Sequence, residues 1–103
     1  MGEQYQATFS IPANHPALPG HFPGAPVVPG VVLLDLVLQT SEAWLGSPLK
    51  ASGVRHVKFH FPLLPEQRAE LMLELGTHQL AFRIAHDEQL IAQGVFDLER
   101  FSE

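Results

Sequence analysis

The chain has 103 residues, of which 46 % are hydrophobic, and a formal net charge of −5. This length predicts a single domain over residues 1–103, and an acidic balance without any basic run excludes the electrostatic pattern of a nucleic-acid or membrane-surface binder. The absence of cysteine excludes disulfides, thiolate catalysis and cysteine-ligated metals. Only 17 % of the residues are charged, against about 25 % in typical soluble proteins, so we expect an oligomer that hides part of this surface.

Targeting signals are not recognisable in this sequence. The first ten residues, MGEQYQATFS, lack the basic and apolar regions of a signal peptide. The longest apolar run, Val31 to Leu38, is interrupted by Asp35 and is too short to span a bilayer. We therefore expect a cytoplasmic protein that binds neither membranes nor nucleic acids.

A strand and a constrained loop are predicted at the start of the chain. The loose alternation of Tyr5–Ile11 is typical of a strand. The segment Pro12–Gly30 holds six of the nine prolines and three of the eight glycines, which excludes a helix there. Apolar residues such as Leu18 and Val27 are interleaved with these breakers, so we expect an ordered functional loop and not a flexible linker.

A helix is predicted over Gly30–Leu45. Pro29 precedes it, and Gly46 followed by Pro48 is a typical helix end. Because the first two turns are apolar on every side, we expect them to be buried all round.

Four alternating runs fill the second half of the chain. Val57, Phe59 and Phe61 alternate with polar neighbours, and three further runs cover residues 69–75, 80–85 and 91–98. Gly53 and the out-of-phase Val54 indicate a bulge or bend. The short connections predict an antiparallel meander. A helix that is apolar all round needs a sheet curved about it, so we predict an α+β fold in which an antiparallel sheet wraps one long central helix.

Asp35 is unusual for its place, because it interrupts the apolar part of the predicted helix. Burying an unpaired carboxylate is unfavourable by several kcal/mol. One interpretation is structural, namely a carboxylate that accepts a hydrogen bond from a nearby backbone donor. The other is functional, namely a carboxyl group in apolar surroundings that acts as a general acid.

His21 is the histidine with the strongest functional interpretation. Proline and glycine residues on both sides restrict its backbone, and a preorganised imidazole suits general-base catalysis near neutral pH. The other five histidines lie in predicted turns or on the outer face of a strand. Of these, His56 and His60 give only a weak metal signal, because a site needs more ligands.

The segment Gly20–Val31 (GHFPGAPVVPGV), continuing to Asp35 and Gln39, resembles the signature of bacterial 3-hydroxyacyl-[acyl carrier protein] dehydratases. Residues 57–65 (VKFHFPLLP) also resemble the strand that follows the helix in this family. These are hot-dog-fold enzymes of fatty acid synthesis, in which a sheet wraps a long helix. The resemblance therefore implies the same architecture that the pattern of apolar residues predicts, a sheet around one central helix.

The resemblance implies a catalytic pair and an activity. His21 and Asp35 are fourteen residues apart and fill both positions of the family's pair. In the implied reaction, a 3-hydroxyacyl thioester loses water to give a trans-2-enoyl thioester. His21 removes a C2 proton, the backbone N–H of Gly30 polarises the thioester carbonyl, and Asp35 positions or protonates the departing hydroxyl.

The resemblance also implies a substrate tunnel and partners. Four apolar residues are candidates for the tunnel wall: Phe22, Val28, Leu34 and Phe59. The substrate arrives on an acyl carrier protein, and the catalytic pair is completed across a homodimer or larger homo-oligomer, without a metal or an organic cofactor. Six basic residues are candidates for docking the acidic carrier: Lys50, Arg55, Lys58, Arg68, Arg83 and Arg100.

Two departures from the family pattern leave alternatives open. Stand-alone dehydratases usually carry Glu where Asp35 stands, and dehydratase–isomerases carry Asp. The chain is shorter than typical dehydratase–isomerases and is more similar to small dehydratases of aryl-polyene or specialised-lipid synthases. Glu66 stands where the family commonly has Gly, which we expect to alter one turn. The alternative functions are a hot-dog acyl thioesterase and a non-catalytic acyl-binding subunit of a lipid synthase.

Overall fold

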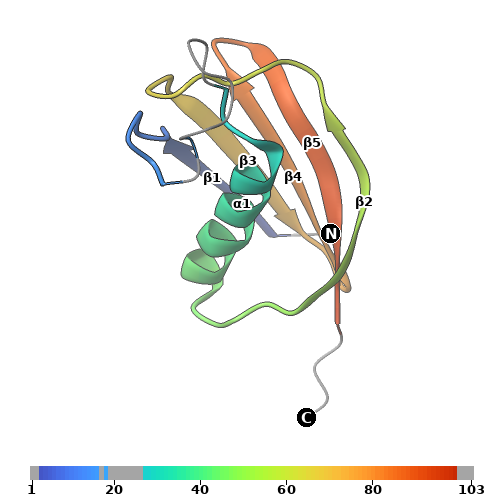
Figure 1. Cartoon of the computed structure of the whole chain (residues 1–103). Helices are drawn as coiled ribbons and strands as arrows, with labels where there is room; N and C mark the ends of the chain where they lie inside the picture. Colours follow the sequence, from blue (N-terminus) through green and yellow to red (C-terminus); the bar gives the residue numbers. More distant parts are fainter. Residues whose placement is uncertain (1–2, 17, 19–26, 100–103) are drawn as a thin grey trace.

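One helix lies against one face of a five-stranded antiparallel sheet (Figure 1). The computed structural model describes residues 3–16, 18 and 27–99. The elements are β1 (Glu3–Phe9), α1 (Gly30–Leu45), β2 (Ala51–Phe59), β3 (Ala69–Leu75), β4 (Gln79–His86) and β5 (Gln89–Leu98), and the strand order is β1-β3-β4-β5-β2. The predicted α+β class is confirmed. Within the described residues, no helix has the length and apolar character needed to cross a membrane.

The limits of α1 are those predicted from its flanking residues. Pro29, in an extended conformation, precedes the first helical residue, Gly30. Gly46 ends the helix with a φ of 71°, and its N–H donates to the Glu42 carbonyl at 2.8 Å. This left-handed conformation is accessible to glycine without a steric penalty. The Glu42 carboxylate then accepts a hydrogen bond from the Leu49 N–H at 2.8 Å, which ties the chain after the helix back to its last turns.

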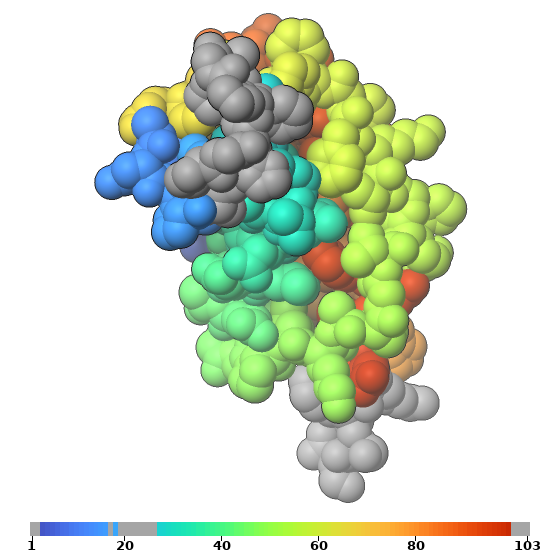
Figure 2. Space-filling model, in the orientation of Figure 1, coloured from blue at the N-terminus to red at the C-terminus, as the bar shows by residue number. Residues whose placement is uncertain are grey.

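The prediction that the first turns of α1 are buried all round is wrong for the single chain. Leu33, Val37 and Ser41 are fully buried against the sheet, but Val31 is 71 % exposed and Asp35 is also exposed. Figure 2 shows the outward surface of α1 open between the N-terminal segment and the residues that follow the helix. A single sheet covers only one side of a helix, so an apolar sequence on all sides does not by itself produce burial on all sides.

Strands β3, β4 and β5 form the predicted meander. On β3, Leu71 and Leu73 are buried while Glu70 and Glu74 face solvent, as the alternation indicated. The turn between β4 and β5 places Asp87 and Glu88 at φ values of 48° and 68°. Two successive positive φ values are typical of the two-residue turns whose twist matches a β-hairpin.

Strand β2 departs from the meander, because it pairs with β5 and not with its successor β3. The segment between β2 and β3 carries the chain across the end of the sheet, and Leu63 within it is 1 % exposed. His60 and Phe61 still donate to the Ile91 carbonyl of β5, at 2.7 and 3.4 Å. Because β4 and β5 lie between β3 and β2 in the sheet, this connection is a crossing and not a tight hairpin. β1 occupies the freed place beside β3.

The predicted irregularity in β2 is confirmed. Its register against β5 shifts between Ala51 and Gly53 and again between Arg55 and Lys58. His56, inside the second shift, has a φ of 56°. An extra residue in one strand produces such a β-bulge and turns the neighbouring side chains relative to the regular alternation.

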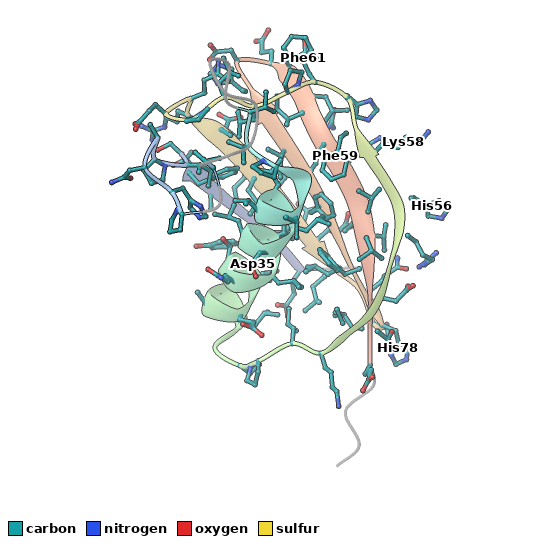
Figure 3. All side chains as sticks on the ribbon, viewed as in Figure 1. Asp35, His56, Lys58, Phe59, Phe61 and His78 are labelled. Carbon is teal, nitrogen blue, oxygen red and sulfur yellow. The ribbon has the colours of Figure 1, made fainter. Side chains whose placement is uncertain are left out.

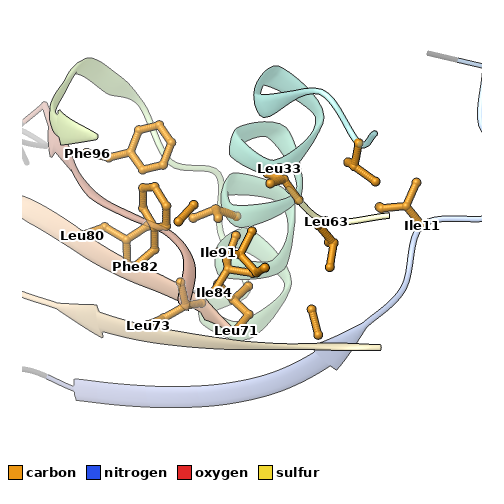
Figure 4. Close-up of a cluster of buried hydrophobic side chains, with 14 of the residues drawn as sticks. Ile11, Leu33, Leu63, Leu71, Leu73, Leu80, Phe82, Ile84, Ile91 and Phe96 are labelled. Carbon is orange, nitrogen blue, oxygen red and sulfur yellow. The ribbon is translucent and has the colours of Figure 1, made fainter. Parts of the chain in front are cut away.

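The core lies between α1 and the inner face of the sheet (Figure 4). Its buried side chains come from α1, from β3 to β5 and from the loops, and they include Ile11, Leu33, Leu63, Leu71, Leu80, Phe82, Ile84, Ile91 and Phe96. The rings of Phe82 and Phe96 contact each other at a centroid distance of 5.6 Å. On the edge strand β1, Tyr5 stacks on Trp44 near the end of α1, with ring centroids 5.1 Å apart.

Gly94 of β5 permits the close packing of β2 and β4 side chains over this core. A Cβ at Gly94 would lie 2.7 Å from Val57 Cγ2 and 2.9 Å from Phe82 Cε2. Both distances are shorter than a carbon–carbon contact allows. The glycine that interrupts the alternation of β5 is therefore explained by two neighbouring side chains that occupy its face.

We predict that Gly94→Ala lowers the free energy of unfolding by about 1–3 kcal/mol, because Val57 and Phe82 must move to admit a methyl group. The matched control is Gly53→Ala in β2, where the nearest atom to the added Cβ is Asp97 Oδ2 at 3.9 Å. Chemical denaturation of the three proteins measures the difference. Equal midpoints for Gly94→Ala and Gly53→Ala would contradict the packing argument.

Candidate active site

The start of α1 offers backbone N–H groups toward a hollow in the surface. Val32 and Leu33 donate to the Pro29 carbonyl at 3.0 and 3.3 Å, and no side chain among the described residues caps the helix. The first N–H groups of a helix have no partner inside the helix, and they lie at the positive end of its dipole. The N–H of Gly30 is one of these groups. An acceptor that develops negative charge is favoured at this position.

The hollow beside Gly30 has a volume of about 280 Å³. Its wall is formed by residues 27–30 and Leu33 from the start of α1, by residues 59–63 at the end of β2, and by Ile91 of β5. Three of the residues predicted to contact the substrate, Val28, Gly30 and Phe59, line it. Leu34 is not among the lining residues and packs half-buried against the core. Phe22 lies outside the described residues.

Phe59 covers the first residue of α1. A Cβ at Gly30 would lie 2.7 Å from Cζ and 2.9 Å from Cε1 of the Phe59 ring. Figure 3 shows this ring pointing from β2 toward the helix, whereas His56 and Lys58 point away from it. Phe59 nevertheless remains 52 % exposed. Glycine at position 30 therefore lets an aromatic ring lie directly over the helix start, with part of the ring open to solvent.

Asp35 lies on α1 beyond this hollow, and its carboxylate is exposed in the single chain. The apolar surroundings expected from the sequence are absent there. Its Oδ2 accepts a hydrogen bond from Gln39 Nε2 at 2.7 Å. The partner is thus a side-chain amide and not the backbone donor considered in the structural interpretation of Asp35. This contact leaves Oδ1 accessible to a second donor.

Gln39 is a site residue that the sequence reasoning did not single out, although it stood in the quoted signature. Residues four apart on a helix are neighbours on one face, so the spacing of Asp35 and Gln39 was the available signal. Val31 precedes Asp35 by the same interval, and all three side chains are exposed. They form an outward stripe on α1, the stripe 31/35/39, directed away from the chain's own sheet.

His21 lies outside the described residues, so its position relative to Asp35 stays a prediction. His56 and His60 are both exposed. In the described part of the chain, no group of three or more His, Asp or Glu side chains is placed to hold a metal ion.

The basic residues differ in their partners. Lys50 forms an ion pair with Glu99 at 3.6 Å, and Arg55 forms one with Asp97 at 2.7 Å. Arg68 Nη2 donates to Thr8 Oγ1 at 3.4 Å. Lys58 and Arg83 form no ion pair with any described residue, and both line a broad hollow of about 900 Å³ on the outer face of the sheet. Arg100 lies outside the described residues.

A family model described as ApeI-like, ApeI dehydratase, matches residues 1–95. The curated relatives include the 3-hydroxyacyl-[acyl-carrier-protein] dehydratase FabZ of Mannheimia succiniciproducens, which is 34 % identical over 82 residues, covering 72 % of this chain and 55 % of the relative. FabZ of Myxococcus xanthus is 32 % identical over 87 residues, covering 76 % and 57 %. The chain thus spans little more than half the length of these relatives.

Among solved structures, the dehydratase heterocomplex ApeI:P from Xenorhabdus doucetiae is similar with a TM-score of 0.86 and 29 % identity, covering 94 % of this chain and 88 % of the other. An uncharacterized protein from Erwinia carotovora subsp. atroseptica has a TM-score of 0.82 and 24 % identity, covering 99 % and 87 %, which shows a likeness of fold alone. The predicted hot-dog fold is confirmed. From its sequence match and its architecture, the chain belongs to the ApeI-like dehydratase family.

Proposed function

We propose that this chain removes water from a 3-hydroxyacyl thioester on an acyl carrier protein and forms a trans-2-enoyl thioester. The observation that carries the proposal is the start of α1 at Gly30, which no described side chain caps, which borders an apolar-walled hollow and which is followed by the outward carboxylate of Asp35. The FabZ relatives are named for the same reaction. We place this activity in the cytoplasm, in the synthesis of fatty acids or of polyene-type products.

The proposed mechanism divides the reaction between three groups. The His21 imidazole removes a proton from C2, and the electron pair moves toward the thioester carbonyl. The Gly30 N–H stabilises the developing charge on the carbonyl oxygen; one such donor contributes about 3–4 kcal/mol in other enzymes. Asp35 donates a proton to the C3 hydroxyl as the C3–O bond breaks, and water leaves.

Gln39 supports the role of Asp35 in this mechanism. Its amide N–H holds Oδ2 at 2.7 Å and so fixes the orientation of the carboxyl group. Oδ1 then remains for the substrate hydroxyl. A carboxyl group with one oxygen already held needs less reorganisation when the hydroxyl departs, which is the general advantage of a preorganised site.

We expect His21→Ala and Asp35→Asn each to lower kcat by about 10²-fold or more, because general acid–base groups contribute about 10²–10⁴-fold. The measurement is formation of enoyl carrier protein from a 3-hydroxyacyl carrier protein, followed by mass spectrometry. Thermal unfolding of each variant is the control for folding. Full activity in both variants would refute the assignment.

The same assay separates the alternative functions. Release of the free carrier thiol in place of enoyl product would indicate a thioesterase. Binding of the acyl carrier without any turnover would indicate a non-catalytic acyl-binding subunit.

The proposed assembly is a homodimer in which a second chain covers the outward stripe 31/35/39. Val31 is 71 % exposed, and Phe61 and Leu64 at the end of the sheet are also exposed hydrophobic residues. Removing these apolar side chains from water would favour association with a second chain. Because Asp35 points away from its own sheet, we infer that its carboxyl group meets His21 of the other chain. The ApeI:P structure is a heterocomplex, so a different partner chain is the alternative occupant.

Mixing the two inactive variants tests whether the catalytic pair spans two chains. If each site takes His21 from one chain and Asp35 from the other, a His21→Ala chain paired with an Asp35→Asn chain has one intact site. Random 1:1 co-assembly should then restore about a quarter of the wild-type activity. Each variant alone, co-assembled with itself, is the control. No restoration in dimers shown to be mixed would contradict a shared site.

Lys58 is the basic residue that we propose for docking the carrier protein. It neighbours Phe59 in β2, which borders the hollow, and no described acidic residue pairs with it. We expect Lys58→Glu to raise KM for a carrier-bound substrate about tenfold while kcat and the KM for a small pantetheine thioester stay unchanged, because complementary surface charges act mainly on encounter. Lys50→Glu, at a residue already paired with Glu99, is the control. An equal rise in both variants would contradict a specific docking role.

A further inference from the structure

The turn before β3 places Glu66 in a conformation that favours glycine. Its φ is 72°, in the left-handed region that side chains with a Cβ rarely adopt. Two hydrogen bonds between Leu64 and Gln67 stabilise the turn. Gln67 Oε1 accepts from the Leu64 N–H at 2.9 Å, and the Gln67 N–H donates to the Leu64 carbonyl at 3.3 Å. A glutamate at this position therefore calls for a compensating contact.

Glu66 makes that contact with the start of the Pro12–Gly30 segment. Its Oε2 accepts a hydrogen bond from the Ala13 N–H at 2.9 Å, across 53 positions of the sequence. Its own N–H donates to the Ile11 carbonyl at 2.8 Å. Ile11 is fully buried in the core, so the two bonds join the turn to an anchored part of the chain.

The same turn region also holds the other end of the segment. The Val28 N–H donates to the Leu63 carbonyl at 2.8 Å, and both side chains are buried. Residues 14–27 are therefore bounded by two attachments on residues 63–66. Fixing both ends of a segment reduces the number of conformations open to the residues between them. His21 lies in that interval.

We propose that Glu66 is a positioning residue, whose carboxylate fixes the start of the Pro12–Gly30 segment and thereby holds His21 in place to remove the C2 proton. The inference rests on the proposed dehydratase function for the role of His21. Glycine would adopt the φ of position 66 without strain, but it has no acceptor for the Ala13 N–H. Glutamate at position 66 is thus unfavourable for the backbone of the turn, but its carboxylate supplies the acceptor for the Ala13 N–H.

The experiment compares Glu66→Gly, Glu66→Gln and Glu88→Gly. Glu66→Gly should keep or raise the unfolding temperature, because the strained φ is relieved, yet lower kcat about tenfold with KM changed less than twofold. Glu66→Gln retains a side-chain oxygen as acceptor and should stay within about threefold of wild-type kcat. Glu88→Gly relieves a similar φ of 68° in the β4–β5 turn, at a residue that does not bond to Ala13, and should leave kcat unchanged.

Amide hydrogen exchange gives a second measurement that does not depend on turnover. In Glu66→Gly, exchange should quicken at Ala13 and through residues 14–27, while in Glu88→Gly it should change only around the β4–β5 turn. Wild-type kcat in Glu66→Gly, slow exchange at Ala13 in that variant, or an equal loss of kcat in Glu88→Gly would each overturn the proposal. If the wild-type protein forms no enoyl product, the proposed function fails instead, and the exchange data still report on the attachment.

Discussion

The one-sided packing of α1 on a single sheet is the constraint on which the rest of the structure depends. The sheet buries Leu33, Val37 and Ser41, and it leaves the stripe 31/35/39 facing outward. The same packing places the start of α1 against the end of β2, where Phe59 lies over Gly30. An apolar hollow, the Gly30 N–H at its border and an outward carboxylate are therefore all placed by one helix–sheet contact. The outward exposure of Asp35 would be lost if the helix were covered on every side by its own chain.

The crossing between β2 and β3 links the sheet to the segment that carries His21. Leu63 enters the core from this crossing, and its carbonyl accepts from the Val28 N–H. Three residues later, Glu66 bonds to Ile11 and Ala13. The crossing between β2 and β3 therefore matters for the site. A tight hairpin between these strands would have no residues that bond to the two ends of the Pro12–Gly30 segment.

Local signals in the sequence were sufficient to predict the helix and the strands, but not how these elements pack against one another. Pro29 and Gly46 predicted the limits of α1 correctly, because they act through backbone geometry alone. The exposure of Asp35 could not be predicted, since apolar neighbours within a helix do not specify which side the sheet covers. The place of β2 beside β5 was missed because strand order depends on contacts between distant segments. Gly94 interrupts the alternation of its strand, and Val57 and Phe82 explain it only when three strands are placed together.

The proposed assembly also accounts for the low charged fraction of the chain. A second chain over the stripe 31/35/39 would remove the Asp35 carboxylate from water, which is unfavourable by several kcal/mol unless the group is hydrogen-bonded. The amide of Gln39 already supplies one such bond at 2.7 Å. Burial of exposed apolar side chains such as Val31 and Phe61 opposes the remaining penalty at about 25 cal/mol per Å². An interface of few charges around one hydrogen-bonded carboxyl group is therefore consistent with both stability and acid catalysis, and it makes the catalytic environment of Asp35 a property of the assembled protein.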